Sequence, residues 1–284
     1  MDSTRPSRGA APDASVVSGF SRESVTVSRP STLLESALQY NRTPILLLLV
    51  LLPAVSWLWI VVMARDMYGP MTGASAWMMT PRWDVSHLLL LWAMWAVMMT
   101  AMMLPSASPL MLLYGAAVRR TAADTSQRRI YALAAGYLAL WAVFSLAATV
   151  IQRVLASLLL LSPMMEAASS RMTAALLVVA GVYQMTPAKQ ACLRACQSPL
   201  GFLVSHWRDG LSGAFRMGLA HGMYCVGCCW ALMLLLFAGG VMNLTVIAAL
   251  TAFVALEKLV SLGRRGAAVS GVLLLAAALW VAFH

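Results

Sequence analysis

Charged side chains are scarce in this sequence, and acidic ones are the scarcest. Charged residues make up 11% of the 284 positions, with 10 Asp and Glu against 20 Lys and Arg. Soluble domains carry about 25% charged residues. Hydrophobic residues make up 61% of the chain. This composition excludes a soluble globular domain and predicts an all-α fold, a polytopic helix bundle in the lipid bilayer.

The net charge of +10 does not predict a nucleic acid partner. The basic residues lie in short loops between apolar runs, which is typical of membrane orientation. No nucleotide-binding loop is present in the sequence, so any transport would be driven by a gradient or by a downstream acceptor. The five cysteines are an odd number and are not spaced like a secreted disulfide framework.

Residues 1–43 contain no apolar run long enough for the core of a signal peptide. They are rich in Ser and Arg and contain several prolines, so they predict a disordered cytosolic tail. The acidic residues Asp2, Asp13, Glu23 and Glu35 argue against a mitochondrial transit peptide. Residues 44–284 are predicted to form a single transmembrane helical domain.

Seven apolar segments follow the tail, most with the roughly 20 residues that a spanning helix needs. They are 44–64, 84–104, 130–152, 168–187, 212–237, 242–260 and 267–283. The fourth is the least certain span, because Arg171 and Pro187 leave only about 15 apolar residues for a helix that needs roughly 20. The second continues past Pro105, so we expect a kink or break there.

The basic residues orient these segments. With the N-terminus in the cytosol, sixteen of the 20 Lys and Arg residues fall on the inner side. Only Arg65, Arg82, Arg153 and Arg171 fall on the outer side. This asymmetry follows the positive-inside rule and supports a cytosolic N-terminus.

The stretch GLAHGMYCVGCCWALM, residues 218–233, contains no charged residue. At about 100° per residue, His221, Cys225 and Cys228 fall within an arc of roughly 60° on one helix face, and Cys229 lies beside them. One buried cysteine alone is usually a packing residue. Three thiols and an imidazole together at bilayer depth instead predict a metal site.

Two further cysteines, Cys192 and Cys196, lie in YQMTPAKQACLRACQSP, on the predicted cytosolic side. The cytosol is reducing, so both are expected to be thiols. Their spacing of four places them on one face of a short helix. They are predicted to accept the metal from the membrane thiols, and a purely structural role is the alternative.

Methionine is abundant, with 20 residues. Met94, Met98 and Met102 form one stripe of the second apolar segment, and Met99 and Met103 lie beside it. Six others fall in outer loops or at outer helix ends: Met67, Met71, Met78, Met79, Met164 and Met165. Thioether and thiolate ligands together select Cu(I), so the pattern predicts inward passage with binding that tightens toward the cytosol. The alternative is that these methionines fill gaps in the core.

One helix cannot complete such a site, since His221 and Cys228 are about 10 Å apart along the helix axis. A further ligand is expected from the methionine stripe on another helix. The small residues Ala214, Gly218 and Gly222, spaced by four, predict that a neighbouring helix approaches closely beside the thiols.

Three other polar residues have structural interpretations. Asp84 precedes the second apolar segment and is predicted to be its N-cap. Glu257 and Lys258, near the inner end of the sixth segment, are interpreted as an interfacial ion pair.

The motifs WAMWAVMMTAMMLPSASP, YQMTPAKQACLRACQSP and HGMYCVGCCWALM resemble the DUF2182 family of predicted metal-binding integral membrane proteins, over roughly residues 77–260. This resemblance implies a metal in a bacterial inner membrane. A looser similarity links the chain to mercuric-ion transport proteins, which also combine membrane-embedded and cytosolic cysteine pairs. The additional helices and methionines depart from that second pattern.

The leading hypothesis is a multi-pass protein of the bacterial inner membrane, not an enzyme, that binds Cu(I) or another soft ion and translocates it or hands it over. The partner would be a metallochaperone or a membrane enzyme. Two alternatives remain at this point: a membrane thiol-disulfide oxidoreductase, and a metal-holding assembly factor or subunit of a larger membrane enzyme.

Overall fold

The computed structural model describes residues 45, 47–69, 84–121, 123–162, 165–260 and 263–283. The predicted tail and four of the predicted outer methionines, Met71, Met78, Met79 and Met164, lie outside these ranges. Within them the regular elements are helical, apart from one isolated bridge between Leu161 and Ala167. The predicted all-α fold class is confirmed.

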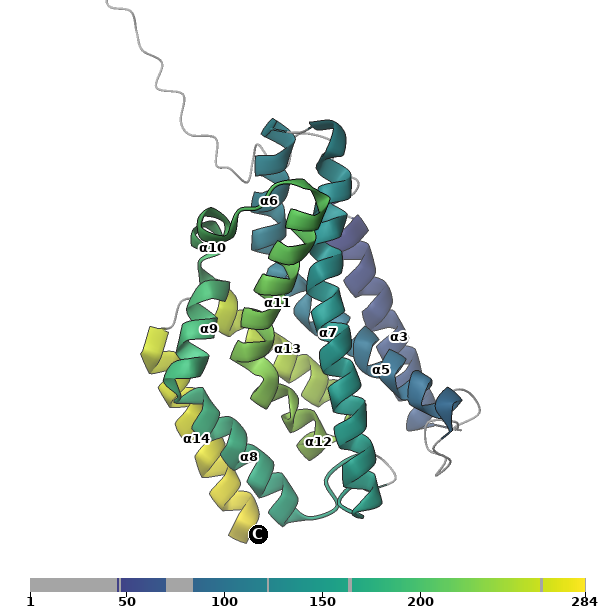
Figure 1. Cartoon of the computed structure of the whole chain (residues 1–284). Coiled ribbons are helices and arrows are strands. Elements are labelled where there is room, and N and C mark those ends of the chain that lie inside the picture. The colour runs from purple at the N-terminus through teal and green to yellow at the C-terminus, as the bar shows by residue number, and fades with distance from the viewer. Residues whose placement is uncertain are drawn as a thin grey trace, which may run out of the picture.

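The main helices pack side by side in a series, each against the next (Figure 1). In sequence order the elements are η2 (Leu47–Leu51), α3 (Leu52–Met67), α5 (Val85–Met103), η3 (Pro105–Ala107), α6 (Ser108–Thr121), η4 (Ala123–Thr125), α7 (Ser126–Ser157), α8 (Ser170–Gln184), α9 (Pro187–Gln197), α10 (Pro199–His206), α11 (Gly210–Met233), α12 (Leu235–Gly239), α13 (Leu244–Leu259) and α14 (Gly263–Phe283). α3 packs on α5, α5 on α7, and α7 on α11. α9 covers another side of α11, and α8 pairs with α14.

Five helices in the described part of the chain are long and apolar enough to cross a membrane. They are Leu47–Met67, Val85–Met103, Ser126–Ser157, Gly210–Gly239 and Gly266–Phe283. Of the seven predicted spans, five are therefore single helices that are long and apolar enough, and the other two correspond to the shorter helices α8 and α13. α8 and α13 have 15 and 16 residues, or about 22 and 24 Å of helix, against roughly 30 Å of hydrocarbon.

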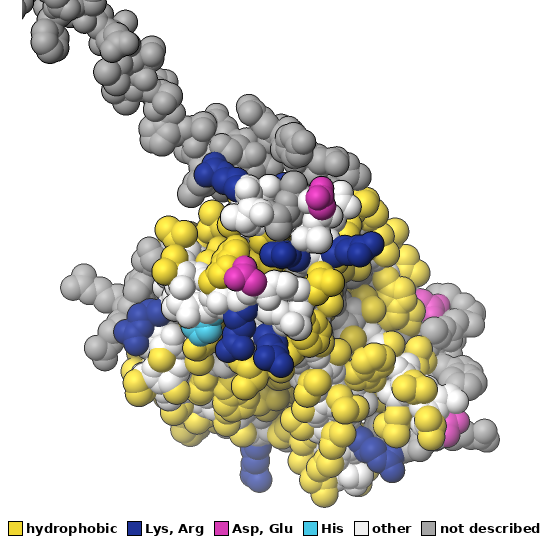
Figure 2. Space-filling model, turned by 45° about the horizontal axis from the view of Figure 1, so that its top comes forward, with side chains coloured by type: hydrophobic (Ala, Val, Ile, Leu, Met, Phe, Trp, Pro, Cys, Tyr) yellow, Lys and Arg dark blue, Asp and Glu magenta, His cyan; other side chains and the backbone are white. Residues whose placement is uncertain are grey.

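The chain still alternates between the two ends of the bundle. α8, α9 and α10 together carry it from the end where α7 finishes to the end where α11 begins, and the C-terminus lies at the α7–α8 end (Figure 1). Figure 2 looks toward the end formed by α6, α10 and the start of α11, where Lys and Arg side chains gather. This end is the one that the sequence places in the cytosol.

Two local predictions are confirmed at the ends of α5. The Asp84 carboxylate accepts a hydrogen bond from the backbone N–H of His87 at 2.9 Å, as an N-cap does. α5 ends at Met103, and Pro105 opens the short helix η3. The long apolar run is therefore broken at Pro105, because proline cannot supply the backbone N–H of a continuing helix.

The close approach predicted beside the thiols is also confirmed, and the neighbouring helix is α7. A Cβ atom at Gly218 would lie 2.0 Å from the carbonyl oxygen of Leu133, and one at Gly136 would lie 2.1 Å from that of Phe215. The two backbones thus meet through a glycine from each helix. This contact fixes α11, which carries three cysteines, against α7.

Gly218→Ala is expected to lower the free energy of unfolding by about 1–3 kcal/mol or more, because the new methyl group meets backbone that cannot rotate away. Gly222→Ala is the matched control in the same helix. Its Cβ would meet the Leu140 side chain at 3.1 Å, which can move aside. Thermal unfolding of the purified proteins in detergent should separate the two variants. Equal melting temperatures would contradict the close backbone contact.

Candidate metal centre

The cysteines of α11 face the interior of the bundle. Cys225, Cys228 and Cys229 are 1%, 2% and 1% exposed. The thiols of Cys228 and Cys229 donate hydrogen bonds to the carbonyl oxygen of Cys225, at 3.1 and 2.8 Å. Such bonds to the preceding turn satisfy short polar side chains inside a helix. The sulfur-bearing face is therefore turned toward protein and away from lipid.

The cysteines of α9 reach the same place. Cys196 Sγ lies 4.0 Å from Cys228 Sγ. Cys192 lies against the backbone of α11, since a Cβ at Gly227 would be only 2.7 Å from its Sγ. The sequence predicts two separate metal-binding sites, one in the membrane and one in the cytosol. In the structure the cysteines of both sites lie side by side. We call Cys196, Cys225, Cys228 and Cys229 the thiol cluster.

Both cysteines of α9 hold their protons more tightly than an isolated cysteine. Hydrogen bonding to Cys225 and Cys228, together with burial, raises the pKa of the Cys196 thiol well above its usual range. Burial, and to a lesser extent the neighbouring Cys228, raises the pKa of Cys192. A metal ion that binds Cys196 as a thiolate must therefore displace a proton.

A buried lysine contacts the thiol cluster, and it does not have the role inferred from the sequence. Lys258 Nζ lies 3.0 Å from Cys225 Sγ, 3.0 Å from Ser106 Oγ and 3.8 Å from Met103 Sδ. The predicted ion pair with Glu257 is wrong. Consecutive residues of a helix do not face each other, which is the sequence signal that could have corrected the interpretation.

Glu257 instead pairs with Lys189 of α9, at 2.7 Å between Oε2 and Nζ. Gln184 of α8 donates to the Glu257 carboxylate at 3.0 Å and to the hydroxyl of Ser270 in α14 at 2.9 Å. The Gln197 amide donates to the Glu257 backbone carbonyl at 2.8 Å. We call these five residues the Lys189 cluster. It fastens α9, and with it Cys196, to α13.

Met103 and Tyr137 complete the surroundings of the thiols. Met103 Sδ lies 3.9 Å from Cys229 Sγ. The Tyr137 hydroxyl lies 3.0 Å from both Cys225 Sγ and the Met103 carbonyl oxygen, and its single proton can serve one of them at a time. The thioether that meets the cysteines thus comes from the last turn of α5, immediately after the predicted stripe.

The other predicted ligands lie in the core around this centre. Met94, Met98 and Met102 are almost completely buried in the hydrophobic core, and their role as metal ligands stays a prediction. The His221 ring packs between Tyr137 and Phe202, at centroid distances of 5.8 and 5.1 Å. Its Nδ1 atom has no hydrogen-bond partner among the residues that the structure covers.

The sulfur atoms of the thiol cluster and Met103 are ligands that suit a soft ion. In the described ranges no three or more His, Cys, Asp or Glu side chains are arranged so that they could hold a metal ion. Metal–sulfur bonds of roughly 2.3 Å allow two sulfurs of one ion to be up to about 4.6 Å apart. The 4.0 Å between Cys196 and Cys228 falls within that limit. His221, one turn before Cys225 in α11, stays a predicted ligand.

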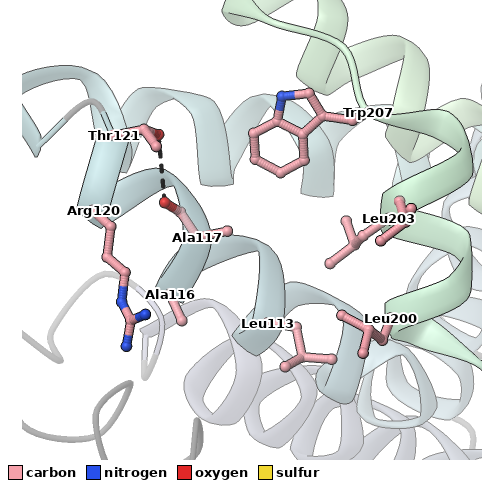
Figure 3. A pocket seen from close by; sticks show the side chains of 9 residues that line it. Leu113, Ala116, Ala117, Arg120, Thr121, Leu200, Leu203 and Trp207 are labelled. Atoms are coloured by element: carbon pink, nitrogen blue, oxygen red, sulfur yellow. Dashed lines mark hydrogen bonds between the residues drawn. The ribbon is translucent and has the colours of Figure 1, made fainter.

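An open groove of about 470 Å³ lies elsewhere, between α6 and α10 (Figure 3). Its lining is Leu113, Ala116, Ala117, Arg120, Thr121, Leu200, Leu203, Val204 and Trp207. This lining is almost entirely apolar and contains none of the predicted ligands, so the groove is not part of the candidate metal centre.

Comparison with known proteins gives one family. The family PpoB2, described as a copper chaperone, matches residues 92–281, more than half of the chain. No curated protein and no solved structure matches. The matched region contains the five cysteines, Met103 and Lys258. The resemblance to DUF2182 stays a prediction, because the matching family carries another name.

Proposed function

Because the chain belongs to this copper chaperone family, we propose that it binds Cu(I) inside a bacterial inner membrane and hands it to a partner on the cytosolic side. The observation that carries the proposal is the meeting of Cys196 from α9 with Cys228 from α11, 4.0 Å apart, beside Cys225 and Cys229. Thiolates and thioethers are the ligands that favour Cu(I) among common biological metals.

The arrangement of donors supports a direction for the ion. Met94, Met98 and Met102 would offer neutral, weak thioether contacts within the bundle. The cysteines of the thiol cluster would bind more tightly, because a thiolate carries a negative charge. Cys192 and Cys196 lie on the short helix α9 outside the five candidate spans. α9 would therefore be the place where a soluble metallochaperone or a membrane enzyme takes the ion.

In this proposal the copper ion is cargo, and the protein is not an enzyme. The residues of this chain supply ligands, exclude water and hold protons that the ion displaces. The Tyr137 hydroxyl lies 3.0 Å from the Cys225 sulfur, and the Ser106 hydroxyl accepts a hydrogen bond from Lys258, the lysine that contacts the same sulfur. Release then requires a competing sulfur ligand from the partner.

One observation supports thiol–disulfide exchange as a second candidate function. The same pair, Cys196 and Cys228, brings sulfur atoms of two different helices to 4.0 Å from each other, and all five cysteines are free thiols. Within α11 a disulfide between Cys225 and Cys228 is disfavoured, because the helix is continuous from Gly210 to Met233 and places their Cβ atoms about 5–6 Å apart.

Titration of the anaerobically purified, reduced protein with Cu(I) tests the proposal. We expect tight binding whose affinity falls as the pH falls, by about tenfold per pH unit for each proton displaced. The raised pKa of Cys196 means that this thiol still carries its proton at neutral pH. Cys196→Ser should therefore reduce the slope of log affinity against pH by about one proton.

Competition with a chromogenic Cu(I) chelator provides the measurement. A protein that binds no Cu(I) would refute the copper proposal. Binding without any pH dependence would refute thiol ligation. A disulfide trapped with a partner protein, without copper, would favour the second candidate.

A further inference from the structure

The described residues contain two buried lysines whose charges are balanced differently. Lys189 is 0% exposed and pairs with the Glu257 carboxylate. Lys258 is 5% exposed, and its recorded partners are a thiol, a thioether and a hydroxyl. An ammonium group buried without a negative partner is very costly. Cys225, as a thiolate, is the group among these partners that can balance Lys258.

The net charge around Lys258 depends on which ion is bound. Metal ions bind cysteine in the thiolate form. Two thiolates of the thiol cluster, the Lys258 ammonium and one Cu(I) ion sum to zero net charge. With a divalent ion the same groups keep one excess positive charge in a low-dielectric interior. Without metal, Lys258 and one thiolate are again neutral.

Ligand type alone does not distinguish monovalent from divalent soft ions, because thiolates bind Zn(II) as well as Cu(I). Resting on the proposed copper function, we propose that Lys258 is the specificity-determining residue of the thiol cluster and restricts it to monovalent soft ions. Cu(I) and Ag(I) fit this charge, and thiophilic divalent ions such as Zn(II) and Cd(II) are rejected.

The size of the effect follows from Coulomb repulsion. A divalent ion near Cys225 feels one unit of repulsion from the ammonium beyond what a monovalent ion feels. With an effective dielectric constant of about 20 and a separation of roughly 5 Å, the additional unit of charge changes the relative affinity by about 250-fold. Lys189 makes no comparable contribution, because Glu257 neutralises it at 2.7 Å.

The experiment measures affinities for Ag(I) and Cd(II) in the reduced full-length protein reconstituted in nanodiscs. The variants are Lys258→Gln, which removes the charge without adding a sulfur ligand, and Lys258→Arg, which keeps it. We expect Lys258→Gln to reduce the preference for Ag(I) over Cd(II) by about 250-fold, and Lys258→Arg to retain most of it. A merely structural lysine would weaken both ions equally, and the ratio would not change.

The outcomes are distinguishable. Failure of the wild type to bind Cu(I) or Ag(I) refutes the proposed function itself. If the wild type binds Ag(I) and the affinity ratio in Lys258→Gln stays within about threefold of the wild-type ratio, the role of Lys258 is refuted. If Lys258→Gln does not fold, Lys258→Leu replaces it. If the wild type binds one Cd(II) as tightly as it binds Ag(I), the proposed selectivity is also refuted, and no variant is needed to show it.

Discussion

Replacing Cys225, Cys228 and Cys229 together by serine is expected to abolish copper binding by the purified protein. Serine has nearly the same shape as cysteine, but its hydroxyl oxygen is a poor ligand for a soft ion. The three thiols are the part of the thiol cluster that lies on α11, and each is at most 2% exposed. Loss of groups that only support ligands costs about 10–100-fold in affinity. Loss of three ligands should exceed that range.

Metal analysis after anaerobic purification, together with Cu(I) titration, gives the measurement. Met111→Leu is the control, because it replaces another fully buried sulfur, one that lies in α6. It should retain the wild-type copper content. If the triple serine variant kept its copper as well, the ligands would have to be sought among His221 and the methionines of α5. The thiols would then be packing residues.

Lys189→Met is expected to have the largest effect on stability. Lys189 and Glu257 form a buried ion pair, with side-chain exposures of 0% and 9%. Removing one partner of such a pair leaves the other charge uncompensated and costs about 3–5 kcal/mol of the free energy of unfolding. The Lys189 side chain also donates to the Gln184 amide oxygen, so that acceptor loses a partner too.

The double variant Lys189→Met with Glu257→Leu separates charge from packing. Replacing both partners by apolar groups should recover most of the stability, since well-packed apolar substitutes for buried ion pairs are often neutral or stabilising. Thermal unfolding of the single and double variants in detergent measures this. A single variant as stable as the wild type would contradict the buried pair. A double variant no better than the single one would show that packing dominates.

The same substitution also tests how α9 is held at the thiol cluster. Lys189 and Gln197 both attach α9 to Glu257 of α13. In Lys189→Met, we expect Cys196 to lose its position beside Cys228. Oxidative crosslinking of these two cysteines should then become slower than in the wild type. In this way a stability defect and a defect in the metal centre would share one cause.

Several elements could be predicted because their determinants are local. The apolar runs fix an all-α membrane fold. Asp84 and Pro105 fix the two ends of α5 through capping and through the missing backbone N–H. The spacing of Cys192 and Cys196 matches the short helix α9, which begins at Pro187. The small residues of α11 indicate close helix packing. Each of these inferences uses residues within a few positions of each other.

Two of the seven predicted spans correspond to helices that are shorter than the apolar segments. In segments 168–187 and 242–260, α8 ends at Gln184 and α13 begins only at Leu244. Helix ends depend on where proline and glycine interrupt the backbone, here at Pro187 and at Gly240, whose φ is 90°. Hydropathy does not register those interruptions.

The sequence by itself determined the apolar all-α fold and the sulfur-rich face of α11 and predicted a soft ion, because composition, helical period and ligand type can all be read along one chain. Only the tertiary structure decided that Cys196 joins the cysteines of α11, that Met103 is the thioether beside them, and that Lys258 faces Cys225 while Glu257 faces Lys189. Those four contacts join residues that are 32 to 126 positions apart in the sequence. They depend on how α5, α9 and α13 pack around α11, and no local pattern encodes that packing.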